Sequence, residues 1–381
     1  MTLSLKLEGS HKHSFSSEIR FLFKVLLIPE RVEDVNNFHY IVLIDTSGSM
    51  SGMKITMAKE GAKNLLRKVP KGNKVTLLSF SKQVEFLSEA SEPEIAIKSL
   101  DKLEAEGPTP LYTALESAIR AYLKHGMPGR VILLTDGKPT DRPEASEYSN
   151  LQIPDGLEVV TIGVGDDYNE AVLKTLAESS NGIFYHLTDP LSIPDLMLKS
   201  APTEVAGKNV TVGIEAERQV KLLNYSGSPV RISAVENTVR ILGETTLQSS
   251  ANGQVLRVSV TYEEPAGGEV KRLEGSLLLT PAKDRDQFLS GLNSKLIQEY
   301  RYFELLRKYE TEISSMDVEG ATKTVSQLSQ LANETRSIEL EETTKRLRQI
   351  LETTKRLGSP EVTKRIQKEV ASEVTKKLRG G

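Results

Sequence analysis

The sequence predicts a doubly wound α/β domain that interrupts an antiparallel β-sandwich and is followed by a helical domain. Apolar strands such as 40–45 and 130–135 alternate with helical segments, short strands with turn signals come next, and a helical period begins at Asp284. These changes of pattern predict four segments. They are 1–35 (N-terminal strands of the sandwich), 36–202 (α/β domain), 203–283 (sandwich) and 284–381 (helical domain).

The α/β domain contains strands that are apolar along their whole length. Such strands are typical of a parallel sheet with helices on both faces. Strands are predicted near 40–45, 74–80, 84–87, 130–135, 158–164 and 183–186. Helices are predicted near 52–68, 92–103, 111–125, 168–179 and 189–201. Asp166 and Asp167 follow the fifth strand, where they either cap the next helix or approach the edge of a site; the cap is favoured.

The flanking segments read as strands of a sandwich. Between 204 and 281, strands are predicted at 209–212, 219–223, 238–241, 255–260 and 274–279. The N-terminal piece contains a strand at 18–27 but is too small to fold alone. We therefore expect it to join the later strands, so that the α/β domain is inserted into the sandwich.

From Asp284 onward the chain is predicted to be helical. Apolar residues recur at spacings of three and four between Phe288 and Leu306, which predicts one long amphipathic helix. Three more helices are predicted near 317–333, 336–356 and 360–378. The Gly-Ser-Pro sequence at 358–360 separates the last two.

The chain ends in Leu-Arg-Gly-Gly at 378–381. This tail resembles that of ubiquitin-like modifiers, which are conjugated through a C-terminal glycine carboxylate, here that of Gly381. In that family the tail follows a β-grasp domain, whereas a helix is predicted before it here. A glycine after a helix is also a common C-cap. Conjugation tail and helix cap therefore both remain as interpretations.

The loop after the strand 40–45 carries the most chemical information in the chain. Asp45, Ser47 and Ser49 occupy alternate positions in it, and Gly48 allows a tight turn between the serines. Ligand sites of parallel sheets lie outside the carboxyl ends of the strands. Carboxylate and hydroxyl oxygens are the ligands that magnesium-type cations select. The loop therefore predicts a divalent-cation site.

Two later segments complete a recognisable pattern. Thr109 lies just before a predicted helix, and Asp136 follows the strand 130–135. Together with the Asp45-x-Ser47-x-Ser49 loop, they resemble the metal-ion-dependent adhesion site (MIDAS) of the von Willebrand factor A (vWA) family. The resemblance covers roughly 36–202 and implies a Rossmann-like vWA domain.

The resemblance also implies a role for each site residue. Ser47, Ser49 and Thr109 would be direct ligands of Mg²⁺, or of Mn²⁺ or Ca²⁺, while Asp45 and Asp136 would act mainly through water and hydrogen bonds. One coordination position would remain for a carboxylate of a protein partner. The alternative is that the five residues are turn and cap residues without a metal.

Composition argues against several classes of protein. The 381 residues include no cysteine, which excludes disulfides, thiolate metal sites and a cysteine nucleophile. A net charge of −3 gives no general attraction to nucleic acid. The chain begins without a recognisable signal peptide and contains no apolar run long enough for a membrane span. A cytoplasmic location is therefore expected.

An enzyme is not expected either. The histidines at 11, 13, 39, 125 and 186 are scattered, and none stands at a recognisable base position. No glycine-rich phosphate loop with its lysine occurs. The histidines are better interpreted as surface or packing residues.

The sequence therefore predicts a cytoplasmic interaction scaffold that holds a cation and recruits a partner through its Asp or Glu carboxylate. The main alternative is an accessory vWA subunit of an AAA-type (MoxR- or chelatase-like) ATPase. A lesser alternative is conjugation through Gly381. A neighbouring ATPase gene of that class would distinguish the first two.

Overall fold

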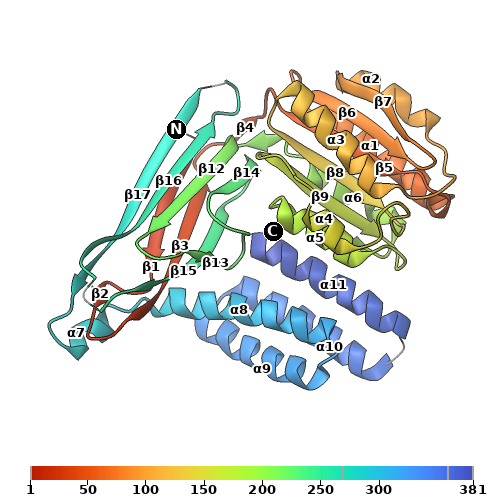
Figure 1. Cartoon of the computed structure of the whole chain (residues 1–381). Helices are drawn as coiled ribbons and strands as arrows, with labels where there is room; N and C mark the ends of the chain where they lie inside the picture. The colour runs from red at the N-terminus through yellow and green to blue at the C-terminus, as the bar shows by residue number, and fades with distance from the viewer. Residues whose placement is uncertain (1, 250, 268, 358–359, 380–381) are drawn as a thin grey trace.

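The computed structural model describes residues 2–249, 251–267, 269–357 and 360–379. An α/β domain and a pair of β-sheets lie side by side in it, and a group of C-terminal helices packs beneath both (Figure 1). The chain passes through one sheet region, forms the α/β domain, returns to the sheet region and ends in the helices.

A six-stranded sheet forms the centre of the α/β domain. Its order is β10-β9-β8-β5-β6-β7, and neighbouring strands are parallel except β7, which is antiparallel to β6. The strands are β5 (His39–Asp45), β6 (Lys74–Phe80), β7 (Val84–Ser91), β8 (Gly129–Thr135), β9 (Leu157–Val164) and β10 (Phe184–Leu187). The six predicted strands are thus present, and β7 extends further than predicted.

Helices cover both faces of this sheet, which confirms the doubly wound α/β arrangement. One apolar core joins the sheet to α1 (Met53–Lys68), α2 (Pro93–Ser99) and α6 (Ile193–Ser200). A second core joins it to α3 (Leu111–His125), α4 (Ala145–Ser149) and α5 (Glu170–Ser179). Val42 and Leu43 of β5 enter opposite cores, because successive strand residues face opposite sides. The short helix α4 was not predicted.

Two of the predicted helices are shorter than the sequence suggests. The helix predicted at 92–103 ends as an α-helix at Ser99 and continues as a 3₁₀ turn, Leu100–Lys102. The helix predicted at 189–201 begins with a 3₁₀ turn, Pro190–Ser192, before α6. Helix ends often tighten into 3₁₀ turns, so the apolar pattern overstates the α-helical length.

Two larger sheets lie outside the α/β domain among the described residues. Their orders are β1-β3-β15-β13 and β14-β12-β16-β17-β2. The strands are β1 (Leu3–Gly9), β2 (His13–Ser14), β3 (Ile19–Pro29), β12 (Gly207–Ala216), β13 (Lys221–Leu222), β14 (Val230–Val235), β15 (Val239–Leu247), β16 (Gly253–Glu263) and β17 (Val270–Pro281). Strand β14 was not predicted. A short ribbon of β4 (Glu33–Asp34) and β11 (Glu204–Val205) lies where the chain enters and leaves the α/β domain.

The C-terminal region is helical, as predicted. Its helices are α7 (Arg285–Ser290), α8 (Ser294–Ser314), α9 (Val318–Thr335), α10 (Ile338–Leu357) and α11 (Pro360–Arg379). The apolar faces of α8 to α11 form one cluster, which also includes Leu22 of β3 and Leu242 of β15. The helices therefore share their core with one sheet.

The single long helix predicted across 288–306 is wrong, because the chain breaks at Gly291. The Gly291 carbonyl accepts a hydrogen bond from the Lys12 N–H at 3.0 Å, and the Asn293 N–H donates to the Ser10 carbonyl at 2.9 Å. The Asn293 side chain then caps α8 by accepting from its first turn. Contacts with the N-terminal segment thus interrupt a helical period that continues in the sequence.

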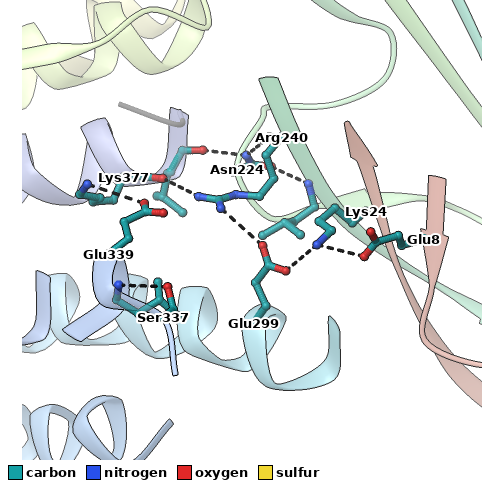
Figure 2. A network of polar contacts seen from close by, with 11 residues as sticks. Glu8, Lys24, Asn224, Arg240, Glu299, Ser337, Glu339 and Lys377 are labelled. Atoms are coloured by element: carbon teal, nitrogen blue, oxygen red, sulfur yellow. Dashed lines mark hydrogen bonds and ion pairs between the residues drawn. The ribbon is translucent and has the colours of Figure 1, made fainter. Parts of the chain in front are cut away.

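A polar network joins the helices to the four-stranded sheet (Figure 2). Glu299 of α8 lies 2.7 Å from the Lys24 ammonium and 3.4 Å from the Arg240 guanidinium, and Lys24 also pairs with Glu8 at 3.0 Å. Arg240 donates to the Lys377 carbonyl of α11 at 3.3 Å. Glu299 of α8 therefore compensates the positive charges of β3 and β15, whereas Glu8 of β1 pairs with the strand residue Lys24.

Helix α11 also packs on β10, the edge strand of the α/β domain. The Lys368 ammonium donates to the carbonyls of Asp166 and Tyr168 at 2.6 and 3.1 Å and lies 3.8 Å from the centre of the Tyr168 ring. The His186 N–H donates to the Ser372 hydroxyl at 3.1 Å. One helix thus holds the loop that follows β9.

Replacing Lys368 by methionine is expected to loosen this loop. The substitution keeps the aliphatic stem but leaves two carbonyls without their charged donor, which costs about 1.5–3 kcal/mol of stability. Hydrogen exchange of residues 165–169 should accelerate, and the unfolding midpoint should fall. Lys364→Met, an exposed change on the same helix, is the control. Equal exchange in both variants would contradict the role of Lys368.

Within the described residues, the helices include none that is both long enough and apolar enough to cross a membrane.

Candidate metal site

The three predicted segments meet at the carboxyl edge of the six-stranded sheet. Asp45 ends β5, and Asp136 directly follows β8, its neighbour in the sheet. The Gly48 N–H donates to the Gly107 carbonyl at 3.0 Å, which joins the first loop to the loop that carries Thr109. The structure therefore brings the predicted side chains of all three loops to one place.

Asp45 is a fully buried carboxylate with both oxygens hydrogen bonded. Its Oδ1 accepts from the Ser47 N–H at 2.7 Å, and its Oδ2 accepts from the Thr135 hydroxyl at 2.5 Å. Burial raises the pKa of Asp45 to about 6, against the opposing effect of these hydrogen bonds; the nearby charge of Asp136 raises it further. The side chain is thus held in one orientation, in a place where its charge lacks solvation.

Hydroxyl groups connect the first loop to the second carboxylate. The Ser49 hydroxyl donates to Asp136 Oδ1 at 2.6 Å, and the Ser47 and Ser49 hydroxyl oxygens are 3.1 Å apart. Asp136 is buried, whereas Ser49 is exposed. Ser49 therefore lies between Asp136 and solvent, whereas Ser47 is itself buried.

Thr109 lies close to Gly137 and Asp45 in the same site. A Cβ added to Gly137 would be 2.8 Å from the Thr109 hydroxyl oxygen and 3.5 Å from Asp45 Oδ2, so glycine leaves the space between them open. The Thr109 backbone is held by Thr140, whose N–H donates to the Thr109 carbonyl at 2.9 Å. Because α3 begins at Leu111, Thr109 precedes the helix, as predicted.

These oxygen atoms fit a hard divalent cation. Two carboxylates and three hydroxyls supply oxygen ligands alone, which is the chemistry that Mg²⁺ prefers. Among the described residues, no group of three or more histidines and carboxylates is arranged to hold a metal. A cation at this edge would therefore depend on the hydroxyl oxygens of Ser47, Ser49 and Thr109.

Two residues of this site were not predicted. Thr135 donates to Asp45, and the Lys54 ammonium forms an ion pair with Asp136 Oδ2. Thr135 ends β8 beside Asp136, so its place at the same sheet edge could have been inferred. The contact of Lys54 depends on how α1 lies against the third loop, and no local signal indicates that.

Other polar residues of the domain lie outside the site. The predicted cap by Asp166 or Asp167 is wrong, because Asn169 caps α5 by accepting from the Val172 N–H. Asp166 and Asp167 lie exposed on the loop held by α11. Gly381, the predicted conjugation terminus, lies outside the described residues.

The histidines at 39 and 186 pack within the fold. His39 begins β5, at the end opposite Asp45, and its Nε2 lies 2.7 Å from the Thr76 hydroxyl. His186 Nδ1 lies 2.8 Å from the Tyr168 hydroxyl. Burial lowers the pKa of each to about 4. Both therefore stay neutral near pH 7.

Two family models match the chain. The von Willebrand factor type A domain matches residues 41–199, and the C-terminal domain of archaellum regulatory network B (ArnB) matches residues 294–380. The first match covers the α/β domain and the second covers the helices from α8 onward.

Known proteins extend this similarity over the whole chain. The crystal structure of the ArnB paralog VWA2 from Sulfolobus acidocaldarius is 30% identical with a TM-score of 0.84, covering 100% of this chain and 98% of that one. A von Willebrand factor type A protein from Catenulispora acidiphila has the same fold, with 18% identity, a TM-score of 0.71 and coverage of 92% and 90%. An uncharacterised protein of Synechocystis sp. is 23% identical over 63% of this chain, which spans 64% of that relative's length. The chain therefore belongs to the family of von Willebrand factor A proteins that includes VWA2 and carries an ArnB-type C-terminal domain.

Proposed function

We propose that this protein binds a divalent cation at a MIDAS and uses it to recruit a protein partner through an Asp or Glu carboxylate. The observation that carries the proposal is the linked set of hydrogen bonds at one sheet edge. Asp45 holds the Ser47 backbone, Ser49 bonds Asp136, and Thr109 lies across a gap that a side chain at Gly137 would fill.

Each residue has a distinct task in this proposal. Ser47, Ser49 and Thr109 offer neutral oxygens as direct ligands, and the buried Asp45 and Asp136 orient them and supply negative charge. When bound, Mg²⁺ (or Mn²⁺ or Ca²⁺) would supply an open coordination position for the partner's carboxylate. The exposed Ser49 indicates the side from which the partner approaches.

We infer a binding protein and not an enzyme. In the part of the chain that the structure describes, neither site carboxylate accepts a hydrogen bond from a histidine. The match to a domain named for a regulatory network favours a regulatory scaffold. An accessory subunit of an AAA-type ATPase would use the same metal-dependent contact, so that alternative is an outcome of the test below.

We also infer that the vWA domain is inserted into a β-sandwich. Strands β1 and β3, which precede the domain, share a sheet with β15, which follows it. Side chains of both larger sheets contribute to one apolar cluster, including Phe23 of β3 and Val258 of β16. A partner bound at the metal would then contact a domain that is anchored by both of its chain ends.

The direct test compares Mn²⁺ binding and partner capture by the native chain and by Asp45→Ala. Calorimetry is expected to detect one Mn²⁺ site in the native chain and an affinity lower by about 10–100-fold in the variant. Proteins captured from a lysate in Mg²⁺ should be lost with chelator and with the variant. An ATPase among them would favour the accessory-subunit alternative.

Asp195→Ala is the matched control, because Asp195 is an exposed carboxylate on α6 of the same domain. It should bind Mn²⁺ and partners as the native chain does. Equal Mn²⁺ affinity in the native chain and in Asp45→Ala, with the same proteins captured in every condition, would refute the proposal.

A further inference from the structure

Lys54 places a fixed positive charge inside the candidate metal site. It is the second residue of α1, and its ammonium pairs with Oδ2 of Asp136 and lies 3.4 Å from the Ser49 carbonyl oxygen. The Asp136 side chain is fully buried, whereas that of Lys54 is 29% exposed. The ammonium is therefore the outer partner of a buried carboxylate.

The position of Lys54 is unfavourable for its own helix. Free N–H groups give the first turn of an α-helix a partial positive charge, which repels cations. The first turn of α1 contains no acidic residue, while Arg67 and Lys68 lie in the last turn, where the helix favours them. The stability of α1 therefore does not explain why a lysine occupies position 54, whereas its ion pair with Asp136 does.

Lys54 changes the charge balance of the site. Both Asp136 oxygens are engaged by protein groups, one by the Ser49 hydroxyl and one by Lys54. Two ionised carboxylates and one ammonium leave a formal charge of −1. A divalent cation would raise this charge to +1, and one partner carboxylate would return it to zero. Without Lys54 the metal-loaded site would already be neutral before the partner arrives.

We propose that Lys54 makes cation binding and carboxylate binding depend on each other. Its ammonium competes with the cation for Asp136 and so weakens binding of the cation alone. Once the cation is bound, the same ammonium adds attraction for a single Asp or Glu side chain of the partner. This inference rests on the proposed adhesion function and adds to it a residue that selects for a negatively charged partner.

The proposed effects of Lys54 on cation binding and on carboxylate binding have opposite signs, and this distinguishes the proposed role from a purely structural one. Removing the charge of Lys54 should strengthen binding of the metal alone and weaken binding of a carboxylate to the metal-loaded site. A merely structural lysine would weaken both when it is replaced. A lysine outside the electrostatic range of the site would change neither.

The test uses Mn²⁺ as the metal and acetate as the carboxylate. Calorimetric titrations with Mn²⁺ are run in chloride and in acetate at equal ionic strength on the full chain. Lys54→Met should raise Mn²⁺ affinity in chloride by about tenfold. The gain in Mn²⁺ affinity from acetate should be smaller in this variant than in the native chain. Lys54→Arg, which keeps the charge, and Lys63→Met, at an exposed position of α1, should both behave as the native chain does.

Thermal unfolding and circular dichroism establish that each variant is folded, and Lys54→Gln replaces Lys54→Met if the latter is not. Native-like Mn²⁺ affinity in the Lys54 variant would overturn the inference while leaving the adhesion function intact, provided that Asp45→Ala lowers Mn²⁺ affinity by about 10–100-fold as expected. Absence of Mn²⁺ binding in both the native chain and the Lys54 variant would overturn the adhesion function itself. Binding that appears only when Lys54 is replaced would support both.

Discussion

Replacing Asp45 by asparagine is expected to stabilise the protein in chelator at pH 7 and to weaken metal binding by about 10–100-fold. Burial raises the pKa of Asp45 from 3.8 to about 6, so the folded chain holds an ionised and poorly solvated carboxylate at neutral pH. A raise of roughly two units corresponds to a cost of about 1–3 kcal/mol at pH 7. Asparagine has nearly the same shape and removes that charge. A residue that costs stability in this way is better explained by a ligand than by the fold.

The pH dependence gives this prediction a definite sign. Because the pKa of Asp45 is raised on folding, its cost is absent below the unfolded pKa and develops as pH rises through about 6. Urea unfolding in chelator should therefore show a gain for Asp45→Asn that is largest at pH 7 and small at pH 4. Adding Mg²⁺ should stabilise the native chain but not the variant.

Asp195→Asn serves as the control, since that side chain is exposed in the first turn of α6 and loss of its charge should cost less than about 1 kcal/mol at either pH. The expectation fails if Asp45→Asn destabilises the metal-free chain at pH 7. In that case the hydrogen bonds that Asp45 accepts from Ser47 and Thr135 would outweigh the desolvation of its charge.

The vWA part of the fold was predictable because its strands are buried on both faces. Strands such as β5 and β8 are apolar at nearly every position, and the sheet brings their carboxyl ends together. Asp45 and Asp136 could therefore be placed at one edge from the sequence alone. Lys54 could not, because its contact depends on the packing of α1 and not on any repeat in the sequence.

In the remainder of the chain, local sequence patterns are not sufficient to predict where helices end or which segments contact one another. The apolar period of 288–306 continues through Gly291, yet hydrogen bonds to a segment about 280 residues earlier in the chain split the helix there. Likewise, no feature of α11 indicates that Lys368 would bond to the loop after β9. Both outcomes depend on contacts between segments that are distant in the sequence, and the spacing of apolar residues does not indicate such contacts.

Replacing Arg130 by methionine is expected to destabilise the protein by about 3–5 kcal/mol. Arg130 of β8 is buried, and its guanidinium lies 3.1 Å from Glu158 of β9 and 3.0 Å from Glu236. It also donates to the carbonyl of Ser200, the last residue of α6, at 3.1 Å. Methionine would leave Glu158 as a buried carboxylate without its cation. Urea unfolding at pH 7 measures the loss.

A nearby surface ion pair provides the matched control. Arg231 of β14 pairs with Asp155 at 2.9 Å, and both side chains are substantially exposed. Arg231→Met should therefore cost less than about 1 kcal/mol, although it also breaks an arginine–carboxylate pair between the vWA domain and the sheet region. Equal losses for the two variants would show that burial of the Arg130 cluster contributes nothing.

The partner of Arg130 can then be tested by a second substitution. Glu158 also accepts a hydrogen bond from the Ser233 hydroxyl of β14, so the cluster spans β8, β9, α6 and the neighbouring sheet. In Arg130→Met/Glu158→Gln the unpaired charge is removed, and part of the lost stability should return. If it does not, the cost lies in the lost contacts of the arginine with Ser200 and Glu236. If it does, the vWA domain is joined to the sheet region by a charge balance at the end of its sheet opposite the metal site.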